Sequence, residues 1–165
     1  MVKRLPVEEL TEQGFAPYGW LIDAERTTPK MKEDIFTFWD GLAELDIQGK
    51  TTLGLLEVVA RSPEFSKLER HVKTEEAFVA LDGSVVVLVS PPTPEKDLPD
   101  PTKVKAFRLE AGKGVHLRQG TWHWIPYPLQ KRVRLLVVFR QGTPDEDLDI
   151  KDLRELIGVS FEIVY

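Results

Sequence analysis

The three histidines of this chain are the side chains with the clearest capacity for chemistry. His71, His116 and His123 all lie in the middle third of the sequence, beside segments that read as strands. Glu69 stands two positions before His71, so on a strand the two side chains would point to the same face. Imidazoles and carboxylates can transfer protons, and together they form an N/O ligand set for a divalent metal ion. Together with Glu76, the pattern predicts one polar site built around Glu69, His71 and His123.

The segment that begins at Glu69 resembles the first motif of the cupin superfamily, G-x5-H-x-H-x3–4-E-x6-G. His71 matches its second histidine, Glu76 its glutamate and Gly83 its closing glycine. Glu69 replaces the first histidine, and the opening glycine of the motif is absent. This resemblance implies a double-stranded β-helix with an altered set of polar side chains at its mouth.

A later segment resembles the second cupin motif, G-x5-P-x-G-x2-H-x3-N. Gly112, Gly120 and His123 match its two glycines and its histidine. Arg118 stands in place of its proline, and Tyr127 stands in place of its asparagine. The replacements in both motifs argue against the three-histidine metal site that is usual in cupins, and they leave the barrel assignment intact.

Nearly the whole chain is similar to the ureidoglycolate lyase family, a cupin branch of about this length. The similarity is carried by residues 14–19, 68–71, 76–78, 112–115 and 122–124, in this order and spacing. It implies a carbon–nitrogen lyase acting on an amide, which splits ureidoglycolate into glyoxylate and urea. It also implies a homodimer.

The reaction implied by the resemblance is the collapse of a carbinolamide, which needs a base, an acid or electrophile, and a cation for the substrate carboxylate. We expect His123 or Glu69 to act as the base. His71 or a bound metal would stabilise the developing charge. The predicted catalytic residues are thus Glu69, His71 and His123.

Three basic residues are candidates for binding the substrate carboxylate, namely Lys67, Arg61 and Arg118. Lys67 shares strand parity with Glu69, which favours it. His116 matches no cupin ligand position, and we include it as a residue that lines the pocket.

A metal site would be formed by Glu69, His71, Glu76 and His123. This N/O set suits nickel or another divalent metal, and the family resemblance points to nickel. A Glu–His pair can also act without metal, so a metal-free mechanism stays an open alternative. There are also structural alternatives. Glu69 and Glu76 could be solvated surface charges, and the histidines could be ordinary barrel residues.

Two other functions compete with the lyase. One is a metal-dependent cupin enzyme of another class, an isomerase or a dioxygenase, although such enzymes keep more of the histidine set. The other is a non-catalytic cupin that binds a small carboxylate. Both would use the same barrel, because fold alone does not determine function.

The elements that position these residues read as short strands separated by turns. Six apolar runs rich in β-branched and aromatic residues are predicted to be strands, at residues 51–60, 76–81, 84–90, 104–109, 133–140 and 161–164. Asp82-Gly83 predicts that residues 76–90 form a β-hairpin. Two short helices are expected, at Val7–Gln13 and at Asp149–Leu156 with Gly158 as a stop. We predict an all-β cupin double-stranded β-helix, an antiparallel barrel forming one domain over residues 1–165, with one or two short peripheral helices.

Composition excludes several classes of protein. A formal net charge of −5 without a basic stripe argues against a nucleic-acid partner. The longest apolar run, Val85–Val89, is far shorter than the ~20 residues of a membrane span. Residues 1–6 do not read as a signal peptide, and the absence of cysteine fits a cytoplasmic enzyme. The expected partner is the small ureide or hydroxy acid that the family resemblance implies.

Overall fold

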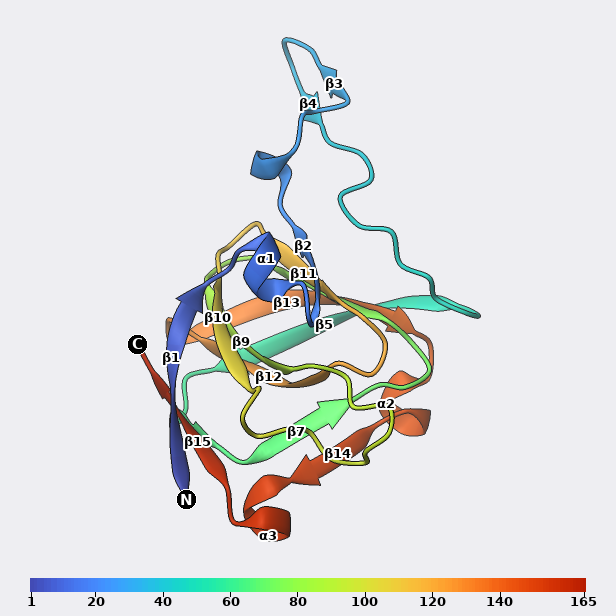
Figure 1. The fold of residues 1–165 in the computed structure, drawn as a ribbon. Coiled ribbons are helices and arrows are strands. Elements are labelled where there is room, and N and C mark those ends of the chain that lie inside the picture. Colours follow the sequence, from blue (N-terminus) through green and yellow to red (C-terminus); the bar gives the residue numbers. More distant parts are fainter.

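The computed structural model describes residues 1–165, and its longer strands form two curled sheets that face each other as a barrel (Figure 1). The eight-stranded sheet contains, in spatial order, β14 (Asp149–Asp152), β7 (Lys67–Arg70), β12 (Trp122–Pro128), β9 (Val85–Ser90), β10 (Lys105–Leu109), β1 (Val2–Glu9), β15 (Ser160–Val164) and β6 (Glu64–Phe65). The five-stranded sheet contains β2 (Gly19–Ile22), β11 (Gly114–Leu117), β8 (Glu76–Ala80), β13 (Arg132–Arg140) and β5 (Thr51–Val59). The prediction of an all-β barrel with short peripheral helices is confirmed.

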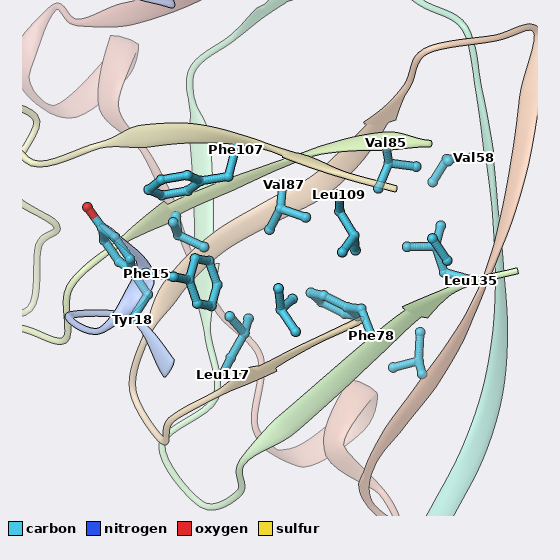
Figure 2. Packing of buried hydrophobic residues seen from close by; sticks show 14 of the residues in the cluster. Phe15, Tyr18, Val58, Phe78, Val85, Val87, Phe107, Leu109, Leu117 and Leu135 are labelled. Atoms are coloured by element: carbon cyan, nitrogen blue, oxygen red, sulfur yellow. The ribbon is translucent and has the colours of Figure 1, made fainter. Parts of the chain in front are cut away.

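The main core fills the space between the two sheets. Val87 of β9 and Phe107 of β10 meet Phe78 of β8 and Leu135 of β13 there (Figure 2). Alternate residues of β9 enter a second apolar cluster on the other face of its sheet, which explains why the strand is buried along its whole length. A strand buried on both faces reads as a continuous apolar run rather than an alternating one.

The predicted hairpin over residues 76–90 is wrong. β8 pairs with β11 and β13, whereas β9 pairs with β10 and β12, so the two strands belong to different sheets. The turn at Asp82-Gly83 carries the chain from one sheet to the other. The Asp82 carboxylate accepts hydrogen bonds from the backbone N–H and the side chain of Arg134 on β13. A turn signal marks a change of direction, and it does not specify which strands pair.

The predicted helices are displaced from their expected positions. Residues 7–9 continue β1 because they pair with β10, and the helix α1 (Glu12–Phe15) begins only after Thr11. Residues 149–152 form β14 because they pair with β7, so α3 (Leu153–Ile157) is one short turn that ends at Gly158. A third short helix, α2 (Thr143–Glu146), was not expected. In each case long-range strand pairing overrides a weak local preference.

Residues 23–50 extend away from the barrel and include the 3₁₀ turn η1 (Ala24–Arg26) and the small hairpin of β3 (Met31–Lys32) and β4 (Thr37–Phe38) (Figure 1). Ile35 near its tip is 92% exposed. None of the helices in the structure has the length and apolar character needed to span a membrane.

Candidate active site

Strands from both sheets bring four polar side chains together at one end of the barrel. Glu69 on β7 lies directly opposite His123 on β12, so the two side chains leave the same face of the eight-stranded sheet. His71 follows the end of β7, and Glu76 opens β8 in the facing sheet. The first cupin-like segment thus contributes to both walls, and the second supplies His123.

The distances within this cluster are short. The Glu76 Oε2 atom lies 3.1 Å from His123 Nε2 and 3.5 Å from His71 Nε2. Glu69 Oε1 lies 3.6 Å from His123 Nε2. The two imidazole rings pack edge to face with their centroids 5.1 Å apart. Both histidines and Glu76 are buried, whereas the Glu69 side chain is 17% exposed.

Backbone carbonyls fix the orientation of both imidazoles. His71 Nδ1 is 2.6 Å from the carbonyl oxygen of Asp147, and His123 Nδ1 is 3.0 Å from that of Thr121. A carbonyl only accepts, so each Nδ1 carries the proton and donates it. Each Nε2 is therefore directed at the carboxylates, and in a neutral ring this nitrogen carries a lone pair and no proton.

The contact between His123 and Glu76 lacks hydrogen-bond geometry, although the two atoms are close. His123 Nε2 and Glu76 Oε2 are both buried without a hydrogen-bond partner. Burial alone would lower the pKa of His123, but the negative charges of Glu76 and Glu69 outweigh it and raise that pKa to about 9. Burial would raise the pKa of Glu76, but the positive charge of His123 lowers it to about 2. In the metal-free protein the pair is therefore ionised near neutral pH.

The donor set fits a divalent metal ion. Ligand atoms of Glu69, His71 and His123 all lie within 4.8 Å of one another, and Glu76 contributes a further buried oxygen. Histidines that bind metals usually donate the other ring N–H to a carbonyl or carboxylate, as both histidines do here. Two nitrogens and carboxylate oxygens suit Ni, Mn or Fe.

The cluster faces an open cavity of about 320 Å³. Fifteen residues line it, and apart from the four cluster residues their side chains are apolar or, in Trp124, aromatic with one N–H. The apolar lining includes Leu56, Phe78, Val137 and Phe139. No Lys or Arg is among the lining residues. A pocket with a few convergent polar groups in an apolar wall is the usual form of a small-molecule site.

Two of the expected substrate-binding residues lie elsewhere. His116 on β11 is buried against Trp20, and its Nε2 is 2.9 Å from a carboxylate oxygen of Glu75. Arg118 stacks over the same Trp20 ring and donates to the carbonyl of Ala16. Neither side chain lines the cavity.

The other two basic residues are near the cavity without lining it. Lys67 begins β7 and is exposed beside Asp152 of β14. Arg61 stacks over Tyr127 and donates to the carbonyls of Ile125 and Pro126. These carbonyls belong to the irregular part of β12 that walls the cavity, so Arg61 supports the wall from behind.

Asp147 is a site residue that sequence reasoning missed. Its carbonyl orients His71, and its carboxylate accepts hydrogen bonds from the backbone N–H groups of Val72 and Lys73 at 2.9 and 2.8 Å. The turn glycine Gly120, with a φ of +80°, donates its N–H to the carbonyl of His71. The motif match identified Gly120, whereas the role of Asp147 depends on a main-chain carbonyl, which any residue type provides.

The sequence comparisons with known proteins agree on one family. The sequence model of a family described as "Ureidoglycolate lyase" matches residues 2–160. A ureidoglycolate lyase of Stutzerimonas stutzeri (strain A1501) is 30% identical over 148 residues, which cover 86% of each chain. One of Chelativorans sp. (strain BNC1) is 28% identical over 149 residues, covering 86% of this chain and 87% of that relative. Among solved structures, oxalate decarboxylase from Bacillus subtilis at pH 4.6 aligns with a TM-score of 0.44 and 15% identity, over 66% of this chain and 25% of that one.

Proposed function

The chain belongs to the ureidoglycolate lyase family, and we propose that its four-residue cluster splits ureidoglycolate into glyoxylate and urea. The observation that carries this proposal is the convergence of two carbonyl-anchored histidines and two carboxylates on one cavity. The same four side chains include a group that can accept a proton and a group that can donate one. These are the two operations that collapse of a carbinolamide requires.

Glu69 is the base in this proposal. Its carboxylate is the more exposed of the two and lies farther from the His123 imidazole than that of Glu76, at 3.6 Å against 3.1 Å, so it can reach the substrate hydroxyl. Removal of the hydroxyl proton forms the aldehyde carbonyl of glyoxylate while the C–N bond breaks. Glu69 then holds that proton.

His123 is the acid. Its Nδ1 donates to Thr121, and its Nε2 lies against the buried Glu76 carboxylate, an arrangement that favours a proton on Nε2. That proton passes to the departing urea nitrogen. Glu76 thus keeps His123 protonated, and His71 lies beside both groups.

Positive charge for the substrate carboxylate comes from within the cluster, because no Lys or Arg lines the cavity. In the metal-free protein the His123 imidazolium supplies it. A divalent metal held by Glu69, His71, Glu76 and His123 would supply Lewis-acid stabilisation of the substrate oxygens. Urea release from ureidoglycolate is measured after chelation and after addition of nickel or another divalent ion. These assays show which metal, if any, the reaction uses.

Substitution of Glu69 tests the proposal. Glu69→Gln preserves shape and removes the base, so we expect kcat for urea release from ureidoglycolate to fall about 10²–10⁴-fold. Glu155→Gln, on the exposed surface of α3, is the matched control and should retain full activity. Undiminished turnover by Glu69→Gln would refute the base assignment, and no urea release by the unmodified protein, with or without metal, would refute the lyase.

We also propose a homodimer located in the cytoplasm. β5 is the edge strand of the five-stranded sheet, and its outer side exposes Leu53, Leu55 and Val59 at 69%, 63% and 55%. Apolar side chains along an open edge strand favour pairing with a second copy. Sedimentation should show a dimer that Leu53→Lys converts to a monomer, and a monomer before substitution would refute it. The cytoplasmic location is supported by the cysteine-free composition.

A further inference from the structure

Outside the catalytic cluster, the cavity is lined by apolar side chains and the Trp124 indole. We infer that the site accepts N-acyl-α-hydroxyglycines whose acyl group carries an apolar substituent, and that it prefers them to ureidoglycolate. This inference rests on the proposed function, because the chemistry is the same carbinolamide collapse. It concerns the half of the substrate that leaves as an amide.

The polar groups of the cavity are confined to the cluster that performs the reaction. The remaining walls are apolar over both sheets, with Leu56, Phe78, Val137 and Phe139 inside and Ile125 and Leu148 nearer to solvent. Ile125 is 38% exposed and Leu148 is 44% exposed, so the apolar surface continues out to the mouth. An exposed apolar rim around a cavity is typical of a ligand-binding surface.

A urea group fits this wall poorly. Its terminal NH₂ has two donors, and away from the cluster no lining side chain is an acceptor, since the Trp124 indole only donates. Burying donors without acceptors opposes binding. An aryl or alkyl group at the same position buries apolar surface instead. The volume of about 320 Å³ lies within the range in which proteins enclose ligands well above ureidoglycolate in size.

The reaction balances without any added reactant. In R–CO–NH–CH(OH)–COO⁻ the bond between nitrogen and the hydroxylated carbon breaks. The hydroxyl proton goes to Glu69, and the nitrogen receives a proton from His123. The products are glyoxylate and the primary amide R–CO–NH₂, and nothing is oxidised or reduced.

Binding of two unreactive analogues tests the preference without depending on turnover. N-benzoylglycine and N-carbamoylglycine lack the hydroxyl group and differ only in phenyl against amino. We expect calorimetry to show about tenfold to a hundredfold tighter binding of N-benzoylglycine, the gain from burying an aromatic ring. Equal affinity, or tighter binding of N-carbamoylglycine, would overturn the inference.

Turnover separates this inference from the proposed function. Glyoxylate release is measured from ureidoglycolate and from N-benzoyl-α-hydroxyglycine. A higher kcat/KM for the benzoyl compound supports the inference. Turnover of ureidoglycolate alone overturns the inference and leaves the proposed function standing, whereas turnover of neither overturns both.

A substitution at the cavity mouth tests whether the exposed rim contributes to the preference for apolar acyl groups. Leu148→Asn places an amide at the exposed mouth, so N-benzoylglycine should bind several-fold more weakly while N-carbamoylglycine is unaffected. Leu156→Asn, on an exposed position of α3, is the matched control and should change neither affinity. If both leucine variants behave like the unmodified protein, the rim is not part of the binding surface and that part of the inference fails.

Discussion

Two histidine–glutamate pairs with buried histidines lie near the start of β8, and they differ in whether their polar atoms are hydrogen-bonded. In one, His116 Nε2 lies 2.9 Å from Glu75 Oε2, and the same oxygen accepts from the backbone N–H of Asp46. In the other, His123 Nε2 and Glu76 Oε2 are 3.1 Å apart without a hydrogen bond and face the cavity. Consecutive glutamates thus enter very different surroundings.

The difference separates a structural pair from a chemical one. Glu75 connects His116 on β11 to the segment that leads into β5, so its hydrogen bonds fasten a long loop to the barrel. Buried polar atoms in native proteins are normally hydrogen-bonded, and exceptions point to a ligand, an ion or a catalytic role. By this criterion the Glu76–His123 pair is the reactive one.

The largest expected effect is on activity, and it distinguishes His123 from His116. His123→Ala should lower kcat/KM for ureidoglycolate about 10²–10⁴-fold, because it removes the proposed acid. His116→Ala should leave kcat/KM within about twofold and lower the free energy of unfolding by about 1–3 kcal/mol, because it leaves the Glu75 carboxylate underbonded. Comparable activity losses in both variants would erase the distinction.

A smaller effect is expected at Asp147, which touches His71 without reaching the cavity. Asp147→Ala removes the acceptor for two backbone N–H groups beside His71, and we expect kcat/KM to fall about 10- to 100-fold, with KM changing less than kcat. Asp145→Ala, exposed in α2, is the control. Nitrogen-15 NMR of the histidine rings provides an independent check: the Nδ1–H tautomer of His71 should be less uniform in Asp147→Ala, and unchanged tautomer and activity would contradict the positioning role.

The smallest effect concerns pH. Glu76→Gln removes the main negative charge that raises the pKa of His123, so in the metal-free protein the alkaline limb of kcat/KM should move from about pH 9 toward lower pH.

The stability of the fold should depend on pH through the same two side chains. The raised pKa of His123 stabilises the fold fully below pH 6.5 and loses that contribution as pH rises through about 9. The lowered pKa of Glu76 stabilises it above pH 4.5 and loses that contribution as pH falls toward about 2.

Thermal unfolding between pH 2 and 10 measures how stability falls toward pH 2 and toward pH 9. Glu76→Gln should make both decreases smaller. An alkaline limb that stays at the same pH in Glu76→Gln would show that His123 owes its proton to another group. Arg132→Gln, an exposed substitution on β13, is a suitable control for nonspecific charge effects.

The sequence predicted the barrel and six of its thirteen strands, because apolar runs and turn residues report local burial. It misassigned the partner of residues 85–90, because pairing depends on contacts far away in the chain. The helix expected at residues 7–13 failed for the same reason, since β1 obtains its hydrogen bonds from β10 and β15. Local patterns specify elements better than they specify neighbours.

The sequence predicted those site residues whose positions in the motifs determine where their side chains point. Glu69, His71, Glu76 and His123 do converge, as the motif spacing indicated, and their chemical roles stay predictions. Arg118 and His116 lie outside the cavity because Trp20 offers them a packing surface, a contact with no sequence signal. Asp147 escaped notice because it acts partly through its main chain.

The parallel pairing of β1 with β15 also constrains how the chain reaches this fold. Val2 is in register with Ser160 and Pro6 with Val164, so two neighbouring strands near one edge of the large sheet join residues that are 158 positions apart in the chain. A ribosome must have released residues 160–164 before β1 can settle between β15 and β10. Such high contact order slows folding, and the nascent barrel has to keep an unpaired β1 edge from aggregating until residues 160–164 have left the ribosome.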